Sequence, residues 1–211
     1  GPAKAWREER AVAGKARLDV EYGSGSSNRF DLFLPDMDSR GLVIFVHGGY
    51  WMKFDQRFWS HLAKGPVERG YTVAMPTYTL CPENRIAGIT KEIGQAVEKI
   101  AGMVAGPIRI AGHSAGGHLA TRMVCADTPL SDRVRQRIRG VVSISGLHDL
   151  RPLMRTGLNE TLKIDAAEAR SESPIFLDPL EGIPVTFWVG GAERSEFIRQ
   201  SELLANCWIG T

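Results

Sequence analysis

The amino-acid sequence predicts an α/β fold, with a mostly parallel central sheet and helices on both faces. Short apolar runs alternate with segments of helical periodicity, and this alternation is typical of parallel sheets. The last five runs are denser in apolar residues than the first two, as strands covered on both faces should be. The alternation has no linker-like gap, so we expect a single domain over residues 1–211.

The first two predicted strands form an antiparallel hairpin at the N-terminal edge of the sheet. Residues 16–22 and 29–35 alternate polar and apolar side chains and flank the turn Gly-Ser-Gly-Ser-Ser at 23–27. The denser runs predict buried strands, in chain order, at residues 42–46, 71–75, 108–111, 141–145 and 185–189.

The clearest predicted helix has apolar residues at i, i+3, i+4, i+7, i+8 and i+11. These residues are Ile93, Ala96, Val97, Ile100, Ala101 and Val104. Residues 58–67 also have a helical pattern, which we expect to break near Gly65-Pro66. A last helix is expected from about Ser195. Residues 151–180 lack a strong period and are predicted to form a cap or an irregular excursion over the sheet.

Composition and charge exclude several classes of function. The formal net charge of +2 gives no general field that would attract nucleic acid or an anionic membrane. No run approaches the roughly 18 apolar residues of a membrane span, and the basic run at 133–139 is expected to be a solvated segment that leads into a strand. The three cysteines form no CxxC pair, which favours reduced thiols in the cytoplasm over a disulfide or zinc site. Gly1-Pro2 is typical of a cleaved tag.

Ser114 is the candidate nucleophile. It lies in Gly-His-Ser-Ala-Gly at 112–116, between the predicted strand at 108–111 and a helical pattern. A nucleophilic serine of the GxSxG type requires this strand–turn–helix context. The turn is tight enough to demand small flanking residues, and it places the serine above the sheet edge at a helix N-terminus. The alternative is an incidental serine at the start of a helix rich in small residues.

A second motif, His-Gly-Gly-Tyr-Trp at 47–51, follows the predicted strand at 42–46. A tetrahedral intermediate needs about two backbone N–H donors aimed at one point, and glycines let the backbone come that close. The expected donors are the amides of Gly49 and Tyr50, with Gly48 as the alternative, together with Ala115. His47 is expected to brace this loop. Trp51 is equally consistent with a core residue and with a wall of the substrate pocket.

Three segments together resemble the α/β-hydrolases of the hormone-sensitive-lipase-like group. They are HGGYW at 47–51, YTLCPE at 78–83 and GHSAGGHLA at 112–120. HGGYW is similar in particular to the kynurenine formamidase (arylformamidase) branch and to bacterial esterases related to it. The resemblance covers nearly the whole chain and implies the α/β-hydrolase fold. Tyr50 stands where the lipase-like group usually has a third glycine.

In this fold the acid of the catalytic triad follows the serine along the chain and precedes the histidine. The loop at 190–197 follows the last predicted strand, and Glu193 matches a position where the formamidases have an aspartate, as the resemblance implies. Such a carboxylate would orient the imidazole of the base. Glu196, in the first turn of the last helix, and Asp149, which is more often structural, are the alternatives.

No histidine of this chain follows Glu193. His113 adjoins Ser114 on a sharp turn, where neighbouring side chains diverge. His118 lies at i+4 from the serine, but no carboxylate is placed to orient it, and His148 is a further alternative. We therefore expect the base on one more strand and loop beyond Thr211, so that the C-terminal strand and histidine loop are missing from this chain.

These observations predict a serine hydrolase that cleaves a small carboxylic ester or an N-formyl or aryl amide through an acyl-enzyme. The resemblance mildly favours an arylformamidase-like activity over a carboxylesterase. Neither a metal nor an organic cofactor is expected. The expected partner is the small-molecule substrate, and neither nucleic acid nor a membrane is expected to bind. A homodimer is a further possibility. The alternative is a non-catalytic ligand-binding protein on the same fold, which a true lack of the histidine would favour.

Overall fold

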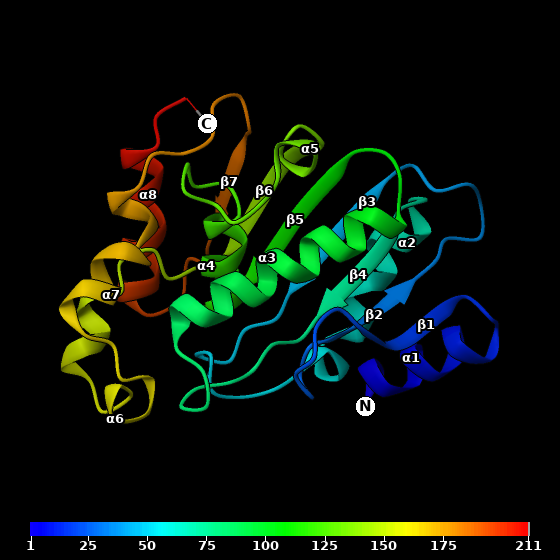
Figure 1. The fold of residues 1–211 in the computed structure, drawn as a ribbon, viewed down its shortest axis with the longest axis horizontal. Coiled ribbons are helices and arrows are strands. Elements are labelled where there is room, and N and C mark those ends of the chain that lie inside the picture. Colours follow the sequence, from blue (N-terminus) through cyan, green and yellow to red (C-terminus); the bar gives the residue numbers. More distant parts are fainter. Residues whose placement is uncertain (211) are drawn as a thin grey trace.

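The computed structural model describes residues 1–210, which form one seven-stranded sheet flanked by helices (Figure 1). The spatial order of the strands is β1-β2-β4-β3-β5-β6-β7. Their bounds are β1 Ala16–Glu21, β2 Arg29–Phe33, β3 Leu42–Val46, β4 Thr72–Pro76, β5 Ile108–His113, β6 Ile138–Ile144 and β7 Val185–Trp188. Every predicted strand is confirmed, although β6 begins three residues earlier than expected.

The predicted edge hairpin is confirmed, because β1 pairs antiparallel with β2, with a register shift between Arg17 and Val20. β2 also pairs antiparallel with β4. From β4 to β7 all neighbours are parallel. The carboxyl ends of these parallel strands therefore meet at one edge of the sheet, where ligand sites of open α/β sheets lie.

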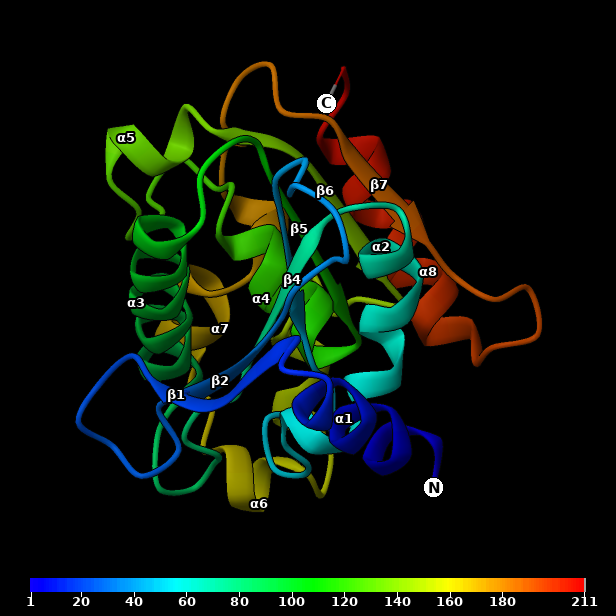
Figure 2. The same cartoon turned by 90° about the vertical axis from the view of Figure 1, so that its right-hand side faces the viewer.

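Helices cover both faces of the sheet, as predicted. Figure 2 shows α3 and α4 on one side of the sheet and α1 and α2 on the other. The α-helices are α1 Pro2–Val12, α2 Lys64–Glu68, α3 Ile86–Met103, α4 Ala115–Arg122, α5 Asp132–Arg135, α6 Asn159–Leu162, α7 Ala166–Ser171 and α8 Ser195–Cys207. Short 3-10 helices are η1 Gln56–Phe58, η2 Ser60–Ala63, η3 Arg151–Arg155 and η4 Pro174–Phe176. No helix within residues 1–210 is long and apolar enough to cross a membrane.

The core has two parts, one on each face of the sheet. The larger part lies on the face that α3 covers, and the predicted stripe of α3 is buried there, with Val104 partly buried just past the helix end. The smaller part lies under α1 and α2, where the Trp6 and Phe33 rings lie 4.7 Å apart. Helix α1 was not predicted from the sequence, and its buried Trp6 anchors it to the sheet.

The expected helix break at Gly65-Pro66 is wrong. Pro66 lies in the first turn of α2 (Lys64–Glu68), where a missing backbone N–H costs nothing. The regular helix is interrupted earlier instead, by the 3-10 turns η1 and η2. Phe58 is 59% exposed and Leu62 is 41% exposed, so these two side chains do not form the expected core-facing stripe.

Residues 151–180, for which the sequence predicts a cap or an irregular excursion, contain the short helices η3, α6, α7 and η4. Two ion pairs, one partly buried and one buried, join this segment to the helices on one face of the sheet. Arg85, just before α3, contacts Glu168 at 2.5 Å, and Arg122 of α4 contacts Glu172 at 3.1 Å. That this excursion acts as a cap over a site stays a prediction.

The basic run at 133–139 is more than a solvated segment that leads into a strand. Arg137 donates hydrogen bonds to the carbonyls of Ala101, Val104 and Gly106, at and beyond the C-terminal end of α3. A cation at this end of a helix satisfies carbonyls that have no intrahelical donor. The sequence pattern showed the charges but not this capping role.

Candidate active site

Ser114 occupies the sharp turn between β5 and α4. Its backbone has φ of 56° and ψ of −117°, a conformation that non-glycine residues rarely adopt. Its N–H donates to the carbonyl of Ile144 in the neighbouring strand β6, at 2.8 Å. The candidate nucleophile is thus held at the carboxyl edge of the sheet, at the N-terminus of α4.

The two glycines of the GxSxG motif are required by close packing. A Cβ atom added to Gly112 would lie 2.0 Å from the carbonyl oxygen of Gly116. One added to Gly116 would lie 2.0 Å from the carbonyl oxygen of Val46 in β3. Since backbone atoms cannot give way by that much, the turn around Ser114 tolerates no side chain at either position.

The His-Gly-Gly-Tyr-Trp loop lies directly against Ser114. A Cβ atom added to Gly48 would lie 3.1 Å from Ser114 Cβ and 2.6 Å from the carbonyl oxygen of His113. Positive φ angles follow at Gly49 (125°) and Tyr50 (53°), so the backbone turns sharply here. The structure therefore brings together the two motifs from which the sequence predicted an oxyanion hole.

The proposed oxyanion donors have no competing acceptor in the part of the chain that the structure describes. Within residues 1–210, the N–H groups of Gly49, Tyr50 and Ala115 donate to no protein group. Ala115 is the first residue of α4, where backbone N–H groups lack an intrahelical acceptor. Free N–H groups beside a serine hydroxyl are what stabilisation of an oxyanion needs.

The structure favours the core alternative for Trp51. Its side chain is 0% exposed, belongs to the larger core and meets the His118 ring edge-on, with ring centroids 5.2 Å apart. Tyr50 is only half-buried. Of the two aromatic residues in the motif, Tyr50 is the one with surface left for a ligand.

His47 is enclosed by the loop that it was expected to brace. Its Nδ1 lies 2.8 Å from the carbonyl oxygen of Gly48, and its Nε2 lies 3.3 Å from Thr77 Oγ1. Its ring stacks on Tyr78, whose hydroxyl donates to the His47 carbonyl at 3.1 Å. Burial lowers the pKa of His47 to about 4. These contacts fit a structural histidine. Tyr78 supports the His47 loop through its ring and its hydroxyl, a role that was not predicted from the sequence.

Glu193 lies in the loop after β7, at the same edge of the sheet as Ser114. Its Oε1 accepts hydrogen bonds from Ser145 Oγ at 2.5 Å and from the Gly190 N–H at 3.2 Å. Burial lowers the pKa of His113, beside Ser114, while the charge of Glu193 acts in the opposite direction. The Glu193 carboxylate is therefore close enough to His113, the neighbour of Ser114, to influence the protonation of the His113 ring.

The two alternative acids are bound to arginines. Both carboxylate oxygens of Asp149 accept from Arg151 at 2.9 Å, and Arg199 lies 3.5 Å away. Burial raises the pKa of Asp149, but the bonds from Arg151 outweigh it and hold the pKa below its usual value. Glu196 forms a two-pronged pair with Arg199. Among the three candidates, only Glu193 has no guanidinium partner within residues 1–210.

The histidines near the motifs are not bonded to Ser114 in the described part of the chain. His118 Nε2 lies 2.7 Å from the Glu172 carbonyl oxygen, and His148 Nε2 lies 3.2 Å from Ser143 Oγ. Burial lowers the pKa of each ring to about 3. Such rings remain neutral and packed, as expected of structural histidines.

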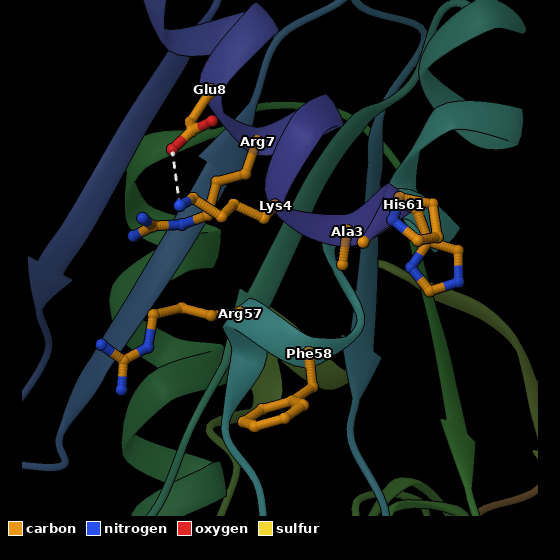
Figure 3. Close-up of a pocket in the computed structure, with 9 residues that line it drawn as sticks. Ala3, Lys4, Arg7, Glu8, Arg57, Phe58 and His61 are labelled. Carbon is orange, nitrogen blue, oxygen red and sulfur yellow. Dashed lines mark ion pairs between the residues drawn. The ribbon is translucent and has the colours of Figure 1, made fainter.

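A hollow of about 520 Å³ beneath α1 is separate from this site (Figure 3). Arg57, Phe58 and His61 line it together with α1, and Lys4 and Glu8 form an exposed ion pair at 3.8 Å there. No predicted site residue contributes to it. Its walls include Gly1 and Pro2, the segment with the pattern of a cleaved tag.

The strand order and the serine turn together define the α/β-hydrolase fold. The chain belongs to the BD-FAE family, whose model matches residues 30–176. It is 31% identical to a kynurenine formamidase of Danio rerio over 88% of this chain. A solved structure from Silicibacter, described as a candidate thioesterase, is 50% identical with a TM-score of 0.93 and covers 98% of this chain.

The chain is shorter than these relatives. It spans 66% of the Danio rerio protein and 79% of the Silicibacter chain. An esterase of Pyrobaculum calidifontis shares the fold at a TM-score of 0.74 and 19% identity, over 97% of this chain and 77% of its own.

Proposed function

We propose that this protein is a serine hydrolase that cleaves a small carboxylic ester or an N-formyl or aryl amide. The observation that carries the proposal is the close packing of Gly48 against Ser114, together with the N–H groups of Gly49, Tyr50 and Ala115, which have no acceptor within residues 1–210. The relatives' names support the same reaction class, since a kynurenine formamidase and a candidate thioesterase both hydrolyse an acyl bond. They do not favour the alternative of a non-catalytic binding protein.

In the first half of the reaction, Ser114 Oγ attacks the substrate carbonyl carbon while a base takes the hydroxyl proton. The resulting oxyanion accepts from the N–H groups of Ala115 and of Gly49 or Tyr50. When the intermediate collapses, the bond to the alcohol or amine breaks, and the leaving group takes the proton from the base. Ser114 then carries the acyl group.

In the second half, the base removes a proton from water, and the hydroxide attacks the acyl carbon. The second tetrahedral intermediate expels Ser114 Oγ, which recovers the proton from the base. The product is a carboxylic acid, or formate where the substrate is a formamide. Glu193 keeps the base in the right tautomer and stabilises its protonated form.

We infer that the general base lies outside residues 1–211. The support is local: His47, His118 and His148 are buried and bonded elsewhere, and the described part of the chain has no histidine on Ser114. The test compares the 211-residue chain with the product of the complete gene on an activated ester. Comparable turnover by the 211-residue chain would contradict the inference and point to His118 or His148.

The substrate class is a further part of the proposal. Since ester and formamide hydrolysis use the same machinery and differ in pocket shape, the names of relatives only mildly favour an arylformamide. The deciding assay compares kcat/KM for N-formylkynurenine with values for short acyl esters. A preference of about 100-fold, worth about 2.7 kcal/mol, would decide between them in either direction.

We also place the protein in the cytoplasm, with no nucleic-acid or membrane partner. Cys81, Cys125 and Cys207 are free thiols within residues 1–210, which fits a reducing compartment. The net charge of +2 supports no polyanionic partner. A homodimer is compatible with this proposal, and light scattering of the purified protein tests it.

A further inference from the structure

We propose that Ser145 is a positioning residue that fixes the Glu193 carboxylate for the general base. The inference rests on the proposed function. Ser145 is the first residue after β6 and is 2% exposed. Its hydroxyl donates to Glu193 Oε1 at 2.5 Å, which is the short distance expected of an O–H bond to a carboxylate.

Ser145 is anchored between the ends of three neighbouring strands. The residue before it, Ile144, accepts the N–H of Ser114 at 2.8 Å, at the end of β5. Ser145 itself donates its N–H to the carbonyl of Trp188 at 2.7 Å, at the end of β7. Its hydroxyl therefore has a defined place relative to both the candidate nucleophile and the strand that leads to Glu193.

The backbone of Ser145 is held in an unfavourable conformation. Its φ is +49°, in the left-handed region that costs a non-glycine residue about 1 kcal/mol or more. The bonds around it hold this conformation. It turns the chain as the strand ends, so that a buried hydroxyl meets a carboxylate from the next loop.

Glu193 needs such an anchor more than an aspartate would. Its side chain has one more rotatable bond than aspartate, and the residue is exposed in its loop. A free glutamate side chain loses about 1.5–2 kcal/mol of rotamer entropy when it is fixed. With Oε1 held by Ser145 and Gly190, Oε2 has no donor within residues 1–210 and is left for an imidazole N–H.

The experiment is a double-mutant cycle in the product of the complete gene. Ser145→Ala should lower kcat by about 10-fold and change KM less than twofold, since a hydrogen bond to a charged group is lost. Ser145→Gly removes the same hydroxyl but relieves the positive φ, so it should give the same loss even if the alanine variant is unstable. In a Glu193→Gln background, the loss caused by Ser145→Ala should shrink to less than twofold.

A pH profile separates positioning from simple destabilisation. A nearby carboxylate raises the pKa of an imidazole, so a loosened Glu193 should shift the acid limb of kcat/KM to lower pH. Ser143→Ala is the matched control, because Ser143 is a buried serine of β6, two residues before Ser145, and its hydroxyl contacts His148 instead. It should shift neither kcat nor the acid limb.

Two outcomes would overturn the role of Ser145. One is unchanged kcat in both Ser145 variants, and the other is an equal loss with and without the Glu193 carboxylate. Failure of the proposed function gives a different result, because the unsubstituted protein would then hydrolyse neither an activated ester nor an N-formyl amide. Unchanged turnover in Glu193→Gln alone would instead overturn the assignment of Glu193 as the acid, whatever Ser145 does.

Discussion

The serine side and the acid side of the candidate site are held by different kinds of contact. Around Ser114, backbones approach so closely that a methyl group at Gly112 or Gly116 would overlap carbonyl oxygens at 2.0 Å. Glu193, by contrast, lies exposed in a loop and is held by hydrogen bonds from Ser145 and Gly190. One side is fixed by excluded volume, and the other is fixed by two donors.

This difference explains how tolerant each side should be to change. Steric fixation around Ser114 admits almost no substitution, since the backbone has no room to move. Hydrogen-bonded fixation around Glu193 can be weakened in steps, because each donor can be removed separately. The following predictions test that contrast, beginning with the largest expected effect.

Replacing Ser114 by alanine should lower kcat at least about 10⁴-fold, because the nucleophile is lost while the rest of the site is kept. The substitution removes only the hydroxyl, and the melting temperature should stay within a few degrees of the parent protein. Steady-state assay on an activated ester measures the loss. Undiminished turnover would remove Ser114 from the mechanism.

Replacing Glu193 by glutamine should lower kcat about 10⁴-fold, judged by the loss when a triad acid becomes an amide. Asp149→Asn is the matched comparison. Its carboxylate is bound by Arg151 and Arg199, so its loss should affect stability more than kcat. A larger loss of kcat in the Asp149 variant would transfer the role of the acid to Asp149.

Replacing Gly48 by alanine should lower kcat about 100-fold, because the added methyl group displaces the loop that carries the oxyanion donors. That methyl would lie 3.1 Å from Ser114 Cβ. Gly102→Ala, in α3, is the matched control, since nothing lies within 4 Å of its added methyl. The control should keep full activity and gain about 0.5–1 kcal/mol of stability. Equal activity in both variants would show that the loop at 48–50 takes no part in the reaction.

Stability should fall as the pH decreases below about 6.5. His47, His118 and His148 have pKa values lowered by burial to about 4, 3 and 3, so the folded state binds their protons less readily than the unfolded state. The stability that these neutral rings contribute is fully present above the pKa that a histidine has in the unfolded chain. It decreases as the pH falls from that value to the pKa of each ring in the folded state. Thermal melts from pH 7 to 4 measure the slope. His148→Gln should reduce that slope, and an unchanged slope would contradict the burial argument.

Most of the fold could be predicted from the sequence, because apolar density and alternation report burial directly. All seven strands and the stripe of α3 follow from such patterns. The errors have local causes. The pattern around Phe58 could not show that 3-10 turns expose that side chain, and α1 has too few apolar residues to show a stripe.

The two sides of the site also differ in how visible they are in the sequence. Steric fixation requires glycine, so Gly112, Gly116 and Gly48 mark the serine side in any reading of the chain. A hydrogen bond between Ser145 and Glu193 joins residues 48 positions apart and leaves no local pattern. The only signal was a polar residue at the end of a predicted strand, which alone does not indicate a partner.

The most direct test of the account is the site of covalent labelling by a fluorophosphonate in the product of the complete gene. The reagent reacts with an activated serine and leaves an adduct that peptide mass spectrometry can map. The account predicts one adduct, on Ser114 in the peptide around Gly112–Gly116, and none in Ser114→Ala. An adduct on another serine, or no adduct in a protein that hydrolyses esters, would contradict it.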